Sequence, residues 1–305
     1  MSFSQEVKKE IVAHDMPKNC CAVAAAYGIA CFAKYFDTHG VVLHTEQLAV
    51  TQYVKKLYEK VGIEGKIYVK GTEANRIYEF AVKEEAQVEK MLSLFGHEKN
   101  TVQLRINSKN FCCENCVHAF VSAAFLAGGT MTNPEKDYNL EFLSIRQSLL
   151  HDFEALLTGH SFSPKRIVRK GAGVLYFKAS EQIEDMLTFM GAFNASLSLM
   201  NAKIYKEIRN KANRLANCDS ANIEKTVEAN QKVLAAVQFL EENKMLSSLP
   251  EILRTAAEMC RQHPEYTLKE LAACFEPPLS KSGLSHRFTK LVQTANDLKE
   301  RKNNG

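Results

Sequence analysis

Residues 119–130, AFVSAAFLAGGT, are the stretch of this sequence that decides its fold. Nearly every side chain in the stretch is small or apolar, which is typical of a helix buried on several sides and close to another backbone. A similar stretch lies 95 residues earlier, where Gly28-Ile29-Ala30 align with Ala123-Ala124-Phe125 and Cys21 aligns with Cys116. We therefore expect two small-residue helices that pack against each other.

The same offset aligns residues 87–96, QVEKMLSLFG, with residues 182–191, QIEDMLTFMG. A duplicated unit of this length predicts two similar half-domains that face one another. A solenoid is excluded because it needs three or more stacked repeats.

Each copy is expected to contain the same elements in the same order. The small-residue helix (residues 17–36 and 112–128) precedes a strand, an amphipathic helix, two further strands and a short helix that ends at a glycine. The ranges are 41–44, 45–61, 66–70, 77–82 and Gly96 in the first copy, and 140–143, 148–157, 166–170, 174–178 and Gly191 in the second. The predicted fold is α+β, a pseudo-two-fold dimer of halves at residues 1–105 and 106–200.

The 119–130 stretch resembles the central helix of LAGLIDADG homing endonucleases, which also duplicate an α+β half around two crossed helices. The chain as a whole resembles the WhiA family, in order, at residues 1–10 (MSFSQEVKKE), 124–135 (AFLAGGTMTNPE) and 277–287 (PPLSKSGLSHR). This resemblance implies an endonuclease-like domain followed by an all-α helix-turn-helix domain. It further implies a bacterial DNA-binding protein of cell division and chromosome segregation, and a transcription factor of sporulation in spore-forming relatives.

The carboxylates of a nuclease are missing from this sequence. LAGLIDADG nucleases hold metal ions with one acid at the base of each central helix, because phosphodiester hydrolysis needs a divalent ion to activate water. The family motif places these acids at Gly128 and, through the repeat, at Ala33. Neither residue can bind a metal ion, so we expect a protein that is not an enzyme and has lost nuclease activity.

Cysteines gather in residues 111–118, FCCENCVH, which contain Cys112, Cys113 and Cys116. A zinc site could use Cys113 and Cys116 together with Cys20 and Cys21 of the other copy. The alternative is that these cysteines act as small apolar residues where helices begin or cross. A single C-x-x-C is a weak motif, and the expectation from sequence is no metal and no cofactor.

The excess positive charge lies in the last third of the chain. Lys and Arg number 22 against 22 Asp and Glu in residues 1–200, but 17 against 13 in residues 201–305. Residues 201–245 are expected to form a basic linker of two helices, the second capped by Asp219 or Ser220. Candidate DNA contacts on the first helix are Arg209, Asn213, Arg214 and Asn217. A helix-cap network with a solvated basic face is the other interpretation of these residues.

Residues 246–305 are predicted to form a helix-turn-helix domain. The expected helices are 250–262, 268–275, which Thr267 and Glu270 cap, and 281–299, which Ser280 caps. The second helix of such a pair enters the major groove by its N-terminal end. The outward residues there are all cationic or hydrogen-bonding, namely Lys281, Ser282, Ser285, His286, Arg287 and Lys290.

The expected partner is therefore double-stranded DNA at a promoter or operator, with a protein partner in transcription or division as a further possibility. The rival interpretation is a protein-interaction module that contacts DNA only nonspecifically. No membrane-length apolar segment and no signal peptide occur in the 305 residues, so a cytoplasmic, nucleoid-associated protein is expected.

Overall fold

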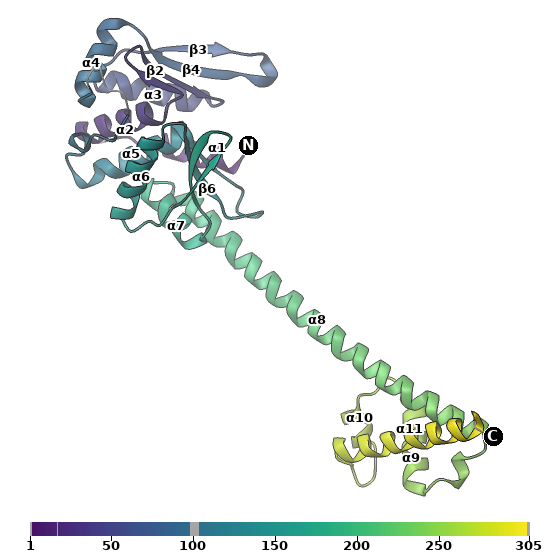
Figure 1. Ribbon diagram of the computed structural model, residues 1–305. Coiled ribbons are helices and arrows are strands. Elements are labelled where there is room, and N and C mark those ends of the chain that lie inside the picture. The colour runs from purple at the N-terminus through teal and green to yellow at the C-terminus, as the bar shows by residue number, and fades with distance from the viewer. Residues whose placement is uncertain (1, 17, 98–103, 304–305) are drawn as a thin grey trace. The chain divides into compact units, whose positions relative to one another are not determined.

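The computed structural model describes residues 2–16, 18–97 and 104–303. The chain divides into two compact units, Met1–Glu207 and Ile208–Gly305 (Figure 1). Each unit has its own hydrophobic core. Residue 17, where the first small-residue helix was expected to begin, lies outside the described residues.

The first unit contains the predicted duplication. After helix α1 (Phe3–Ile11), the first copy has α2 (Asn19–Phe32), β1 (Tyr35–Asp37), β2 (Gly40–Thr45), α3 (Leu48–Lys60), β3 (Lys66–Lys70), β4 (Ile77–Val82) and α4 (Glu85–Phe95). The second copy has α5 (Glu114–Gly128), β5 (Gly129–Met131), β6 (Leu140–Ser144), α6 (Gln147–Gly159), β7 (Lys165–Arg169), β8 (Ala172–Phe177) and α7 (Ser180–Phe189). The element order is identical in the two copies, which confirms the α+β repeat.

Two antiparallel four-stranded sheets result, with the orders β1-β2-β4-β3 and β5-β6-β8-β7. Their registers correspond, since Leu43 pairs with Phe80 in one sheet and Phe142 pairs with Leu175 in the other. Helix α3 covers one face of the first sheet, and α6 packs on the central strands of the second. The buried faces of β2, β4, β6 and β8 supply much of the core around the two central helices.

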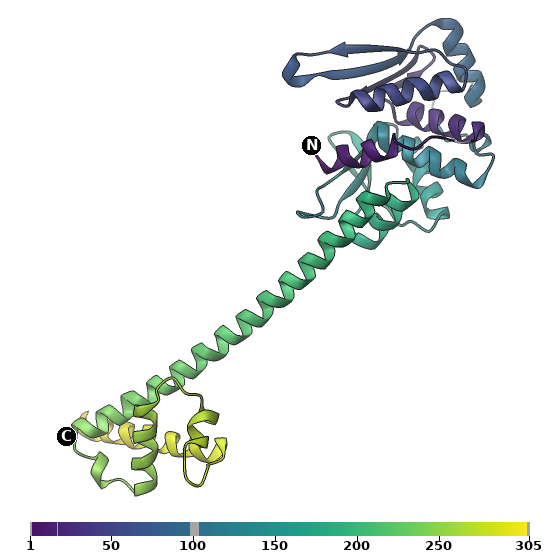
Figure 2. The same ribbon diagram turned by 180° about the vertical axis from the view of Figure 1, so that it is seen from behind.

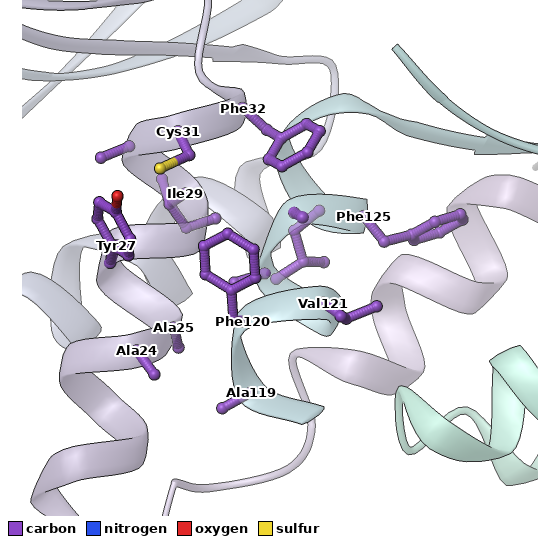
Figure 3. Close-up of a cluster of buried hydrophobic side chains, with 14 of the residues drawn as sticks. Ala24, Ala25, Tyr27, Ile29, Cys31, Phe32, Ala119, Phe120, Val121 and Phe125 are labelled. Atoms are coloured by element: carbon purple, nitrogen blue, oxygen red, sulfur yellow. The ribbon is translucent and has the colours of Figure 1, made fainter. Parts of the chain in front are cut away.

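The central helices α2 and α5 pack against each other as their small residues predicted (Figure 3). A Cβ atom added to Gly28 would lie 2.5 Å from the carbonyl oxygen of Phe120 and 3.1 Å from the Cβ of Ala123. The large side chains of Tyr27, Phe120 and Phe125 are fully buried around this crossing. Glycine at position 28 therefore sets how closely the two halves approach.

The first central helix is shorter than predicted. It ends at Phe32, and residues 35–37, expected to lie in or directly after the helix, form strand β1 instead. The equivalent strand β5 follows α5 directly and was also missed. Both strands have three residues, too few to show the alternation by which a strand is recognised.

Helix α8 (Phe193–Glu242) is unbroken over 50 residues (Figures 1 and 2). The expected second start at Asp219 or Ser220 is therefore wrong, because both residues lie inside this helix. At its beginning, the carboxylate of Glu10 accepts hydrogen bonds from the backbone amides of Asn194 and Ala195, at 2.7 and 3.0 Å. Among the described residues no helix, α8 included, is both long and apolar enough to cross a membrane.

The second unit combines the end of α8 with α9 (Glu251–Gln262), α10 (Leu268–Ala273) and α11 (Lys281–Asn303). Val233, Val237 and Leu240 of α8 are buried in one core with residues of α9, α10 and α11. A division between a linker at 201–245 and a domain at 246–305 stays a prediction. The shared core shows that α9, α10 and α11 pack against the last turns of α8.

Candidate nucleic-acid interface

Helix α10 begins at the predicted capping box. The amide of Glu270 donates to the Thr267 hydroxyl at 3.3 Å, and the amide of Thr267 donates to the Glu270 carboxylate at 2.8 Å. The backbone amide of Thr267 and its hydroxyl both donate to the Glu270 carboxylate, and these two hydrogen bonds lower the pKa of Glu270. The box satisfies two amides that a helix start otherwise leaves unpaired, so it fixes where α10 begins.

The connection from α10 to α11 is held at both of its ends. The amide of Leu279 donates to the carbonyl oxygen of Ala272 at 2.9 Å, which ties the connection back to α10. The Ser280 hydroxyl accepts from the amide of Gly283 at 3.1 Å and caps α11 as predicted. The first turn of α11 is thereby anchored to α10, which is the arrangement of a helix-turn-helix.

The predicted inner face of α11 is buried. Leu284, Leu291 and Ala295 have no exposed surface, Phe288 is 6% exposed, and Val292 is partly buried against the same core. This burial fixes the rotation of α11 about its axis. The opposite side of its first half therefore faces solvent.

Four of the six predicted contact residues on α11 are exposed, namely Lys281, Ser282, His286 and Lys290. Ser285 and Arg287 are partly buried. The Arg287 guanidinium lies over the ring of Phe275, 5.6 Å from its centroid, a distance typical of a cation–π contact. Phe275 therefore positions Arg287 beside the exposed residues at the start of the helix.

The predicted contacts on α8 are all exposed. In the described part of the chain, the side chains of Arg209, Asn213, Arg214 and Asn217 form no hydrogen bond or ion pair. Two lysines one or two turns earlier differ: Lys203 forms ion pairs with Glu181 and Glu184, and Lys206 lies over the ring of Tyr138. Among the described residues, the polar side chains of α8 at positions 209–217 are thus available to a partner.

Where a nuclease would carry its acids, the C-terminal ends of the two central helices are capped by partly buried cations. The Lys8 ammonium donates to the carbonyl oxygen of Leu126 at 3.1 Å, and burial lowers the pKa of Lys8 to about 8. The Arg146 guanidinium donates to the carbonyls of Cys31 and Ala33, at 3.2 and 2.9 Å. A cation at the C-terminal end of each central helix satisfies carbonyls that the helix leaves unpaired.

These two cations were missed from sequence, because neither is near its helix along the chain. Lys8 precedes α5 by more than 100 residues, and Arg146 belongs to the other half from α2. A Cβ atom at Gly128 would also lie 2.8 Å from the carbonyl oxygen of Leu143, so the site leaves little space for a larger side chain there.

Several cations on the two sheets are paired with acids. Glu79, 2% exposed, contacts His44, Lys70 and Lys83. Burial alone would raise the pKa of Glu79, but its hydrogen bonds outweigh burial and lower it to about 2. On the second sheet Arg169 pairs with Glu141 at 3.1 Å. These acids neutralise part of the positive charge on the two sheets, so the sheets attract phosphate less than unpaired cations would.

Four of the cysteines considered from sequence meet in the first unit. The sulfurs of Cys20, Cys21, Cys113 and Cys116 all lie within 4.8 Å of one another. Cys112 is exposed and is not part of this group, because its thiol points to the carbonyl oxygen of Lys109.

Family models match most of the chain. The WhiA LAGLIDADG-like domain matches residues 41–109 and 117–209, and the WhiA C-terminal HTH domain matches residues 212–295. The chain is 34% identical to a probable cell division protein WhiA of Clostridium botulinum, over 98% of this chain and 99% of that protein. It is 35% identical to the protein of the same name from Clostridium perfringens, with the same coverage.

Solved structures show the same fold. The crystal structure of full-length DUF199/WhiA from Thermatoga maritima superposes with a TM-score of 0.61 at 20% identity, covering 97% of this chain and 99% of that chain. Together with the matched domains and the relatives above 30% identity, this confirms the resemblance found in the sequence. The chain belongs to the WhiA family.

Proposed function

We propose that this protein binds a specific site in double-stranded DNA through helix α11 and regulates transcription in connection with cell division. The observation that carries the proposal is the exposed, cationic first half of α11 on a unit that matches a helix-turn-helix family. The relatives named as probable cell division proteins supply the biological setting. Chromosome segregation and association with the nucleoid belong to the same proposal.

The start of α11 suits the major groove for three reasons. Its backbone amides and the positive end of the helix dipole attract phosphate. Lys281 and Lys290 add positive charge, and Ser282 and His286 add hydrogen-bonding groups that reach base edges. Because the opposite face is packed in the core, these side chains approach DNA together with α11 as a rigid element.

Helix α8 provides a second set of contacts in this proposal. Arg209 and Arg214 neutralise phosphates, and Asn213 and Asn217 on the same polar side donate hydrogen bonds. These contacts contribute affinity without sequence information. The first unit adds a surface for a protein partner.

Loss of nuclease chemistry is the second part of the proposal. A divalent ion at the ends of α2 and α5 would meet the Lys8 ammonium and the Arg146 guanidinium in place of two carboxylates. Like charges repel strongly in a partly buried site, and no carboxylate stands at Ala33 or Gly128 to hold the ion.

Supercoiled plasmid incubated with the full chain and Mg²⁺ or Mn²⁺ is therefore expected to remain uncut. The variant Ala33→Asp/Gly128→Asp is expected to gain no cleavage, because Lys8 and Arg146 remain and position 128 lacks space. Gel electrophoresis of the plasmid measures both. Nicking by the wild-type chain that EDTA abolishes would contradict the loss of nuclease activity.

Salt dependence separates DNA binding from the rival function, a protein-interaction module. Binding of the full chain to genomic fragments is measured from low to high salt, with selected fragments sequenced. Site-specific DNA binding predicts enrichment of a common sequence and affinity that falls steeply with salt, by about 0.9 log unit per log unit for each phosphate neutralised. No enriched sequence at any salt concentration would reject the DNA-reading function and favour the protein-interaction module.

Arg287→Ala is expected to weaken binding to the selected site by about 1–3 kcal/mol, because it removes the arginine that Phe275 positions beside the exposed residues of α11. Arg287→Lys is the matched variant, since it keeps the charge but loses the planar fork that binds a base edge with two hydrogen bonds. Affinity is measured for the selected and a scrambled site at equal salt. Equal loss on both sites would show that Arg287 contacts phosphate, and no loss on either would remove it from the interface.

A further inference from the structure

The four cysteine sulfurs in the first unit have the geometry of a metal site. The sulfur of Cys113 lies 3.6 Å from those of Cys20 and Cys21 and 3.5 Å from that of Cys116. All four sulfurs lie within 4.8 Å of one another. Four thiolates bound to one zinc ion at about 2.3 Å in a tetrahedron are about 3.8 Å apart, close to this spacing.

The cysteines come from the starts of the two central helices. Cys20 and Cys21 lie in the first turn of α2, Cys113 is the N-cap of α5, and Cys116 lies in its first turn. Helix N-termini stabilise negative charge, so both helices favour thiolate ligands at this point. Cys21 and Cys116 are buried, which shields a bound ion from water.

Other uses of four close thiols fit less well. A [2Fe–2S] or [4Fe–4S] cluster distributes its four cysteines over two or four irons, which places some of the sulfurs farther apart than this group allows. A disulfide needs a sulfur–sulfur distance of about 2.05 Å, whereas the Cys113 sulfur lies 3.5–3.6 Å from each of the other three and all four cysteines are free. Packing of small apolar residues explains the burial of Cys21 and Cys116, but it does not explain why four sulfurs converge.

The geometry points to a structural zinc site formed by Cys20, Cys21, Cys113 and Cys116, which joins the two halves of the first unit. A closed set of four thiolates leaves no open position for water or substrate, so the ion acts in stability and not in catalysis. Each half contributes two ligands, as the repeat places Cys21 opposite Cys116. Because both pairs begin a central helix, the ion fixes the crossing of α2 and α5 at one end.

The full-length protein is purified without chelator and with a non-thiol reducing agent, and its metal content is measured by elemental mass spectrometry. We expect about one zinc ion per chain. After dialysis, the zinc content of Cys113→Ser is expected to be lower than that of the wild-type chain by roughly tenfold or more. Cys113 is the best residue to change because its sulfur lies within 3.6 Å of each of the other three. Cys112→Ser is the matched control: it removes the neighbouring thiol, which lies outside the group, and is expected to keep its zinc.

Two measurements on the wild-type chain test the site even if Cys113→Ser fails to fold. Cobalt in place of zinc is expected to give the absorption bands of a tetrahedral thiolate site. Titration with a thiol-modifying reagent is expected to release zinc in step with the loss of four thiols. Protein that holds no zinc when zinc is supplied, or whose mass shows a disulfide within the group under the same reducing conditions, would overturn the proposal.

Discussion

Gly28→Val is expected to destabilise the first unit by about 3 kcal/mol or more, and to leave much of it unfolded near physiological temperature. Any side chain at this position begins with a Cβ atom 2.5 Å from the carbonyl oxygen of Phe120, well inside contact distance. The obstacle is backbone at the centre of α5 and cannot rotate away as a side chain would. The two halves would have to move apart, exposing the aromatic core around Phe120 and Phe125.

Thermal unfolding followed by circular dichroism measures this effect, and Gly159→Ala provides the control. Gly159 is the last residue of α6, and a Cβ atom added there meets nothing within 4 Å. Alanine is therefore tolerated at this position and is expected to change stability by less than about 1 kcal/mol. If Gly28→Val unfolded at the same temperature as the wild-type chain, close helix contact would not determine the assembly of the halves.

The duplication was predictable because it leaves two independent signals in the sequence. Small residues recur where α2 and α5 touch, and the pattern QVEKMLSLFG of residues 87–96 recurs in residues 182–191 at the same offset. Neither signal depends on contacts between distant residues. The strands β3 and β4 were predicted at their observed bounds, because both flank a turn at Gly71, whose φ of +87° favours glycine.

The continuity of α8 was not predictable from its capping residues. Asp219 and Ser220 are common at helix starts, but both are also tolerated on an exposed helix at a cost of a few tenths of a kcal/mol each. The informative signal was the absence of glycine and proline from Phe193 to Glu242. Without a residue that breaks the helix, two potential caps do not end it.

Contacts between the halves were the least predictable part of the candidate sites. The Lys8 and Arg146 caps and the meeting of Cys20 with Cys113 join residues about 90 to 120 positions apart. Sequence spacing identified Cys113 and Cys116 as a pair, but only the crossing of α2 and α5 brings four sulfurs together. On α11, by contrast, the helical period and the cap at Ser280 were enough to predict which residues point inward and which point outward. Both follow from local structure alone.

Lys281→Glu/Lys290→Glu is expected to weaken binding of the full chain to its selected DNA site by roughly 100-fold or more at physiological salt, because two exposed cations become two anions on the helix that faces phosphate. The salt slope should also fall by about 2, one for each lost phosphate contact. Arg254→Glu/Arg301→Glu is the charge-matched control, with its changes in α9 and in the last turn of α11. Competition binding across a salt series measures both variants. If both lost affinity equally, net charge alone would govern binding. If only the first did, the N-terminal half of α11 would be the surface that binds DNA.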